Sequence, residues 1–156
     1  MMLPFFEYLQ NTAFTNAVQS SWWAGAAFNV SHLLAMTVFF GALMMVDLRL
    51  MGFGLSDQPL SRVWHESRPW LVAGFIGLVL TGIPQFVSLA IRNYYNFFFW
   101  LKMALLVVAT IYTFVVRKKI VAANERELQG SAKLVGFSSI ALWAVIGVVS
   151  RMIGLS

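Results

Sequence analysis

The 156-residue chain has the composition of an integral membrane protein. Apolar residues make up 60% of it, charged residues only 11%, and the mean hydropathy is +0.76, which excludes a water-soluble globular domain. The chain has no cysteine, so disulfides, thiolate metal sites and cysteine nucleophiles are also excluded. The net charge of +5 does not indicate nucleic acid, because eight of the eleven basic residues fall in two loops between apolar stretches.

Residues 1–20 are predicted to form one amphipathic helix that lies in the membrane interface. Apolar residues recur at helical spacing from Phe6 to Ala17, and polar residues occupy the opposite face. The segment has no basic residue, so it lacks the charged start of a secretory signal. The alternative is a loosely ordered tail.

Residues 21–156 are predicted to form one domain of four transmembrane helices. Each apolar stretch has the roughly 20 residues needed to cross the hydrocarbon core, and aromatic residues mark the edges. The short connections favour an all-α, up-down-up-down bundle. The four spans run approximately over residues 22–46, 70–91, 97–116 and 134–155.

The basic residues predict the orientation of these spans. The loop after the first span and the loop after the third span carry the eight basic residues noted above, whereas Arg92 is the only charge between the second and third spans. The positive-inside rule therefore places both basic loops in the cytoplasm and both termini outside.

Each span is expected to carry a polar side chain into the outer half of the bilayer. With a rise of about 1.5 Å per residue, His32 lies roughly 15 Å below the outer end of the first span. Gln85, Lys102 and Arg151 lie about 7 to 9 Å below the outer ends of the other three spans. Asn29 shares a helix face with His32. A pocket formed by these five residues would be positively charged and would suit a ligand with negative charge.

A b-type haem fits this pocket, with His32 as the iron ligand and with Lys102 and Arg151 beside the propionates. A quinone headgroup or a lipid phosphate would fit it too. The leading interpretation is therefore a redox protein that transfers electrons through a cofactor in the outer half of the bundle. The alternative is a non-catalytic accessory subunit or lipid-binding scaffold, in which the two cations extend to the headgroups and His32 bonds a neighbouring helix.

Copper handling is the third interpretation. Methionine is a soft ligand suited to Cu(I), and His32 with Met36 and Met103 could form a copper site. Methionines spread over four spans are more often packing residues. The sequence has no Gly-rich phosphate loop, paired carboxylates or serine nucleophile constellation, so whether the protein is an enzyme stays open.

The second histidine, His65, is expected at the inner end of the second span, too far from His32 to share an iron. A second axial ligand would then come from a methionine or from His32 of another copy, which favours a homo-oligomer or a subunit of a membrane complex. His65 is interpreted as part of a solvated cytoplasmic charge cluster. Asp47, Arg49 and Arg117 are expected at the same membrane edge, where a salt bridge from Asp47 to a loop arginine would fix the packing of the first two spans.

Three segments carry a family resemblance: HLLAMTVFFGALMMVDLRLMG from His32, FWLKMALL around Lys102, and ALWAVIGVVSRMIG at the end of the fourth span. They resemble a group of small bacterial four-span membrane proteins described only as a domain of unknown function. More distantly, the chain resembles the membrane domain of the copper-resistance protein D group. The resemblance implies a bacterial inner-membrane location. The matching polar positions are His32, Asp47, Arg49, Lys102 and Arg151.

Overall fold

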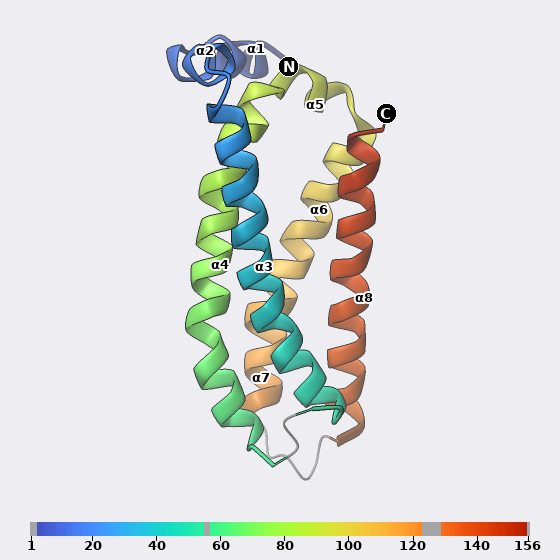
Figure 1. Cartoon of the computed structure of the whole chain (residues 1–156). Helices are drawn as coiled ribbons and strands as arrows, with labels where there is room; N and C mark the ends of the chain where they lie inside the picture. The colour runs from blue at the N-terminus through green and yellow to red at the C-terminus, as the bar shows by residue number, and fades with distance from the viewer. Residues whose placement is uncertain (1–2, 55–56, 123–128, 156) are drawn as a thin grey trace.

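The computed structural model of the protein describes residues 3–54, 57–122 and 129–155, and within these ranges it has helices and no strand (Figure 1). In chain order the elements are α1 (Leu3–Gln10), α2 (Ala13–Ser20), α3 (Ala24–Met51), α4 (Leu60–Ser88), α5 (Ala90–Tyr95), α6 (Phe97–Ile111), the π-helical turn η1 (Tyr112–Val116), α7 (Arg117–Ala122) and α8 (Gln129–Ile153). This confirms the predicted all-helical class.

Four helices are long and apolar enough to cross a membrane: Ala24–Met51, Leu60–Ser88, Phe97–Ile120 and Gly130–Ile153. The third combines α6, η1 and most of α7. They run side by side, with α1 and the end of α8 at the top of Figure 1 and with the ends of α3 and α7 and the starts of α4 and α8 at the bottom. At the lower end, the helices extend beyond the apolar stretches into polar sequence.

The lower ends of α3 and α4 have local sequence signals. α3 ends at Gly52, which has the left-handed φ of 81° that glycine adopts without steric cost. The Gly52 amide donates to the Arg49 carbonyl at 3.1 Å and the Phe53 amide donates to the Leu48 carbonyl at 3.0 Å, which is the Schellman pattern. α4 begins directly after Pro59, whose φ of −64° suits a helix start.

The core lies where α3 crosses its neighbours. α3 packs most extensively against α4 and next against α8. Gly74 on α4 permits the close approach, since a Cβ at this position would lie 2.7 Å from the backbone nitrogen of Phe39. Fully or nearly fully buried apolar side chains from all four spans meet at this level, and they are Phe39, Ala42, Leu43, Leu71, Ala109, Trp143 and Ile146.

The N-terminal segment forms two short helices, α1 and α2, where the sequence predicted a single one. The break falls at Thr12, whose side-chain oxygen accepts a hydrogen bond from the Thr15 amide and so caps α2. Two glutamines attach the pair to the top of the bundle. The Gln10 side-chain oxygen accepts from the Ile91 amide at 2.9 Å, and the Gln19 amide group donates to the Ser88 carbonyl at 2.8 Å.

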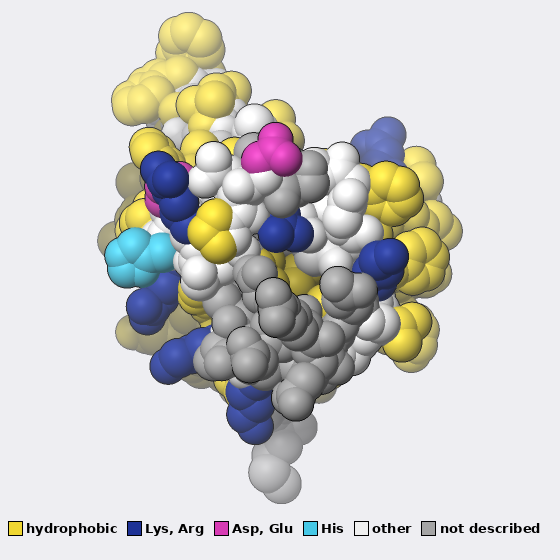
Figure 2. Space-filling view, turned by 90° about the horizontal axis from the view of Figure 1, so that it is seen from below, with side chains coloured by type: hydrophobic (Ala, Val, Ile, Leu, Met, Phe, Trp, Pro, Cys, Tyr) yellow, Lys and Arg dark blue, Asp and Glu magenta, His cyan; other side chains and the backbone are white. Residues whose placement is uncertain are grey.

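The lower end of the bundle is basic. Figure 2, which views this end, shows Lys and Arg side chains spread around it. The ends of α3 and α7 and the starts of α4 and α8 meet at this end, so the described basic residues beside both connections lie on one side of the bundle (Figure 1). His65 is exposed, in keeping with a solvated position.

Candidate functional site

His32 lies on the α3 face that packs against α4. Its ring nitrogen Nδ1 lies 2.8 Å from the Thr81 hydroxyl oxygen. The small residues of α4 permit this contact, because a Cβ at Gly77 would lie 3.0 Å from the Ala35 Cβ and one at Gly82 would lie 3.5 Å from the His32 Cε1. The imidazole is therefore held between two helices and is partly buried.

The bond made by Thr81 determines which His32 nitrogen carries the proton. The Thr81 hydroxyl donates to the Gly77 carbonyl at 2.6 Å. Since a hydroxyl has one proton, the same oxygen accepts from His32, and we assign the proton of the neutral ring to Nδ1. Nε2 then has a free lone pair, and it makes no hydrogen bond to any residue that the structure describes.

Lys102 on α6 is the neighbouring charge. It is partly buried, and it lies close enough to His32 for its charge to act on the imidazole. The described residues form two ion pairs, Arg62–Glu66 and Arg117–Asp47, and neither includes Lys102. An ammonium without a counter-charge in a membrane span is costly and is a candidate for ligand binding.

The other predicted site residues lie in different settings. Gln85 donates to the carbonyls of Phe28 and Thr81, both at 3.3 Å, so its amide group links α4 to α3. Asn29 is exposed and lines, together with Gln85, a hollow of about 290 Å³ beside the His32 site. Arg151 is exposed near the end of α8, and its side chain makes no hydrogen bond or ion pair within the described ranges.

The structure thus places Lys102 within electrostatic range of His32, and Gln85 bonds the carbonyl of Thr81, whose hydroxyl contacts His32. The two methionines of the predicted copper site differ in exposure, since Met36 is partly buried and Met103 is 43% exposed. Across residues 3–54, 57–122 and 129–155, no group of three or more His, Cys, Asp or Glu could hold a metal ion.

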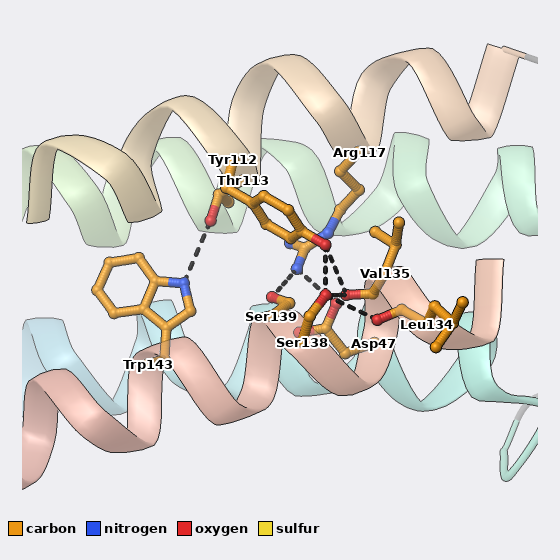
Figure 3. Close-up of polar contacts among 9 residues, drawn as sticks. All are labelled: Asp47, Tyr112, Thr113, Arg117, Leu134, Val135, Ser138, Ser139 and Trp143. Atoms are coloured by element: carbon orange, nitrogen blue, oxygen red, sulfur yellow. Dashed lines mark hydrogen bonds and ion pairs between the residues drawn. The ribbon is translucent and has the colours of Figure 1, made fainter. Parts of the chain in front are cut away.

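A second polar cluster, which the sequence interpretation placed among solvated charges, lies around Asp47 and Arg117 (Figure 3). Arg117 and Asp47 form an ion pair in which both side chains are 0% exposed. One guanidinium nitrogen of Arg117, Nη2, donates to Asp47 Oδ1 at 2.5 Å and to the Ser139 hydroxyl at 2.6 Å. The pair therefore joins α3, α7 and α8.

This geometry corrects the expectation for Asp47. Its partner Arg117, which the sequence placed in the basic loop after the third span, begins α7 at the end of that span, so the pair links the first span to the third and not to the second. The pair is also fully buried, so it is not part of a solvated cluster. Gly136 permits the close packing, because a Cβ there would lie 2.8 Å from the Asp47 carbonyl oxygen. The available signal was helical spacing, since Phe39, Leu43 and Asp47 are four residues apart and share one buried face.

The cluster continues along the π-helical turn. The Trp143 indole donates to the Thr113 hydroxyl at 3.2 Å, and the Tyr112 and Ser138 hydroxyls are hydrogen-bonded to each other (Figure 3). Asp47 Oδ2 and the Nε and Nη1 atoms of Arg117 have no hydrogen-bond partner. A buried ion pair with three unpartnered polar atoms is poorly compensated for the loss of water.

Together, the fold and the His32 site define a small four-span helical membrane protein with a polar site in one half of the bundle. A family model matches residues 5–156, and the chain belongs to this family, DUF6644, a family of unknown function. No curated protein and no solved structure matches the chain. The match supports the resemblance to an uncharacterised four-span family, and the link to the copper-resistance protein D group is not shown.

Proposed function

We propose that this protein is a membrane redox protein that binds a b-type haem through His32. The observation that carries the proposal is the fixed imidazole, in which Thr81 holds Nδ1 and the Nε2 lone pair has no partner among the described residues. A metal-bound histidine typically coordinates through one nitrogen while a second group holds the other. His32 is thus prepared as a proximal haem ligand.

Lys102 supplies the charge that a haem requires. A propionate is an anion, and Lys102 is a cation near His32 with no carboxylate partner in the described ranges. Pairing the two would satisfy the ammonium within the membrane. Arg151 is the second candidate for a propionate, with Asn29 and Gln85 as neutral polar neighbours.

The haem would lie at the surface of the bundle, beside the partly buried His32. One face of the ring would then be covered by lipid or by a second copy of the chain. In a symmetric dimer about an axis along the membrane normal, both His32 side chains lie at the same depth. The proposal therefore includes a homo-oligomer or a larger membrane complex.

A quinone is the second candidate, and the closeness of Lys102 to His32 favours it. An ammonium donates hydrogen bonds and a neutral imidazole Nε2 accepts them, so the two groups match the carbonyl of a quinone and the hydroxyl of a quinol. A partner subunit would supply the electrons in this case. A quinone headgroup is also smaller than a haem and needs less space beside His32.

The proposed location is the bacterial inner membrane, with both termini in the periplasm. The basic lower end supports this orientation through the positive-inside rule (Figure 2). α1 and α2 would then lie in the outer interface, with the exposed Phe5, Tyr8 and Phe14 available to lipid. The His32 site would face the periplasmic half of the bilayer.

An absorption spectrum of protein purified from haem-replete cells tests the proposal. We expect a haem band in the wild type and its loss in His32→Ala, because no other described histidine lies near the site. His65→Ala is the matched control and should keep the band. Thr81→Val should keep iron ligation but shift the midpoint potential, since it removes the group that orients the ring.

A colourless wild type would refute haem binding, as would a band that persists in His32→Ala. Solvent extraction of the same sample, followed by mass spectrometry of the extract, then distinguishes between a quinone-binding protein and a scaffold. A quinone that is retained by the wild type and lost in Lys102→Met would support the second candidate. If the sample contains neither cofactor, the interpretation as an accessory subunit or lipid-binding scaffold remains.

A further inference from the structure

A groove of about 470 Å³ runs between α3 and α4 on the lower part of the bundle. Its walls are mainly apolar, with Val38, Gly41 and Met45 on α3 and Val63, Ser67 and Trp70 on α4. It is separate from the His32 site and from the Asp47–Arg117 cluster, neither of which lines it.

The polarity of the groove changes along its length. Trp70 lies at the start of the second apolar stretch and is 63% exposed, as expected of an aromatic anchor at the membrane interface. Arg62 and Glu66 line the lower end, and Arg62 lies eight residues before Trp70, or about 12 Å along the helix axis. The groove therefore connects the hydrocarbon region to the headgroup region of the inner leaflet.

The lower end presents both signs of charge. Arg62 Nε lies 2.9 Å from Glu66 Oε1, and both side chains are more than 60% exposed. This pairing occupies Nε, and the two terminal nitrogens of Arg62 have no bond within the described residues. These nitrogens can donate to a phosphate, while the Glu66 carboxylate can accept from an ammonium.

The groove also has an unfilled floor. A Cβ at Gly41 would have no heavy atom within 4 Å. The missing side chain leaves room for an apolar chain between Val38 and Met45. A larger residue at position 41 would fill this room without displacing a neighbour.

We propose that this groove binds one phospholipid with a zwitterionic phosphatidylethanolamine headgroup. One acyl chain lies over Gly41, the phosphate binds Arg62 and the ammonium binds Glu66. An anionic phospholipid would place its net negative charge beside the Glu66 carboxylate with no compensating ammonium, so it binds more weakly. The site does not depend on the redox proposal.

Native mass spectrometry of delipidated protein tests the site by titration with phosphatidylethanolamine and, separately, phosphatidylglycerol. We expect the wild type to take up one phosphatidylethanolamine at concentrations at which phosphatidylglycerol is not retained. Gly41→Leu should weaken this binding at least tenfold because it fills the groove. Gly147→Leu is the matched control, since this glycine on α8 is also open to its surroundings and lies outside the groove.

Glu66→Gln gives a second readout on an exposed residue whose loss does not threaten the fold. It should abolish the preference for phosphatidylethanolamine over phosphatidylglycerol while keeping a bound lipid. Equal binding by the wild type and Gly41→Leu, or equal binding of both lipids by the wild type, would overturn the proposal in favour of non-specific lipid. A Gly41→Leu variant that loses dimer while keeping lipid would overturn it in favour of a contact between copies.

Discussion

The buried Asp47–Arg117 pair predicts that single and double replacements have different effects on the stability of the protein. Both side chains are 0% exposed, and one guanidinium nitrogen makes all the side-chain hydrogen bonds of Arg117, to Asp47 and Ser139. Arg117→Met or Asp47→Leu alone would leave the other ion buried without its partner. The double variant would leave no buried charge and would keep comparable apolar volume.

The size of the expected change in the free energy of unfolding follows from the burial of this ion pair. Removing one partner of a buried ion pair typically costs about 3–5 kcal/mol, whereas replacing both with apolar residues is often neutral or stabilising by about 1–4 kcal/mol. Here Asp47 Oδ2 and Arg117 Nε and Nη1 already lack partners, so the pair gains less than a fully bonded one. We therefore expect each single variant to lose about 3–5 kcal/mol, and the double variant to be at least as stable as the wild type.

Unfolding in detergent by titration with a denaturing detergent, followed by far-UV circular dichroism, measures these differences. Arg62→Met is the matched control, because it breaks an exposed i,i+4 pair with Glu66 that should contribute only about 0.3–0.5 kcal/mol. The reasoning is refuted if Arg117→Met costs no more than Arg62→Met. It is also refuted if the costs of the two single variants simply add in the double variant, since coupled residues do not behave additively.

Three further predictions concern packing, orientation and the N-terminal segment. Gly74→Ala should destabilise the bundle by about 1–3 kcal/mol, measured in the same assay, because its Cβ would lie 2.7 Å from the Phe39 nitrogen; an unchanged stability would contradict the close packing. A cysteine in place of Leu155 should react with an impermeant maleimide added outside intact cells, while one in place of Gly130 should react only after lysis. Reversed labelling would show that the orientation is wrong. Deletion of residues 3–20 should leave an inserted bundle of lower stability, and failure to insert would show that this segment is needed for more than docking.

The helical architecture follows from the sequence because hydropathy reports membrane spans directly. Four apolar stretches predicted four long helices, and the structure has them. The ends of those helices were harder to predict, because hydropathy does not show where a helix continues into polar sequence. α4 begins at Leu60, ten residues before the apolar stretch that starts at Trp70, and the Pro59 signal for this start is local.

The two polar clusters differ in how far the sequence reveals them. The rise per residue placed His32 about 15 Å and Lys102 about 8 Å below the outer ends of their spans, and in the structure Lys102 is within electrostatic range of His32. The role of Thr81 depends on the register between α3 and α4, which single-chain periodicity does not report. Arg117 was placed with the cytoplasmic charges because it begins a basic run, although its position in the packed bundle is fully buried.

The π-helical turn just before Arg117 has a consequence for the register of the third span. In a regular α-helix, positions four apart drift by about 40° around the axis, so Ala109, Thr113 and Arg117 would spread over about 80°. All three are nevertheless buried, and the wider turn Tyr112–Val116 takes up the drift between the last two. The span thus behaves as two helices in different rotational phase. Deletion of the exposed Val115 would remove the residue that the wider turn accommodates, and in a regular α-helix Arg117 would then follow Thr113 by three positions and lie about 60° from it around the axis.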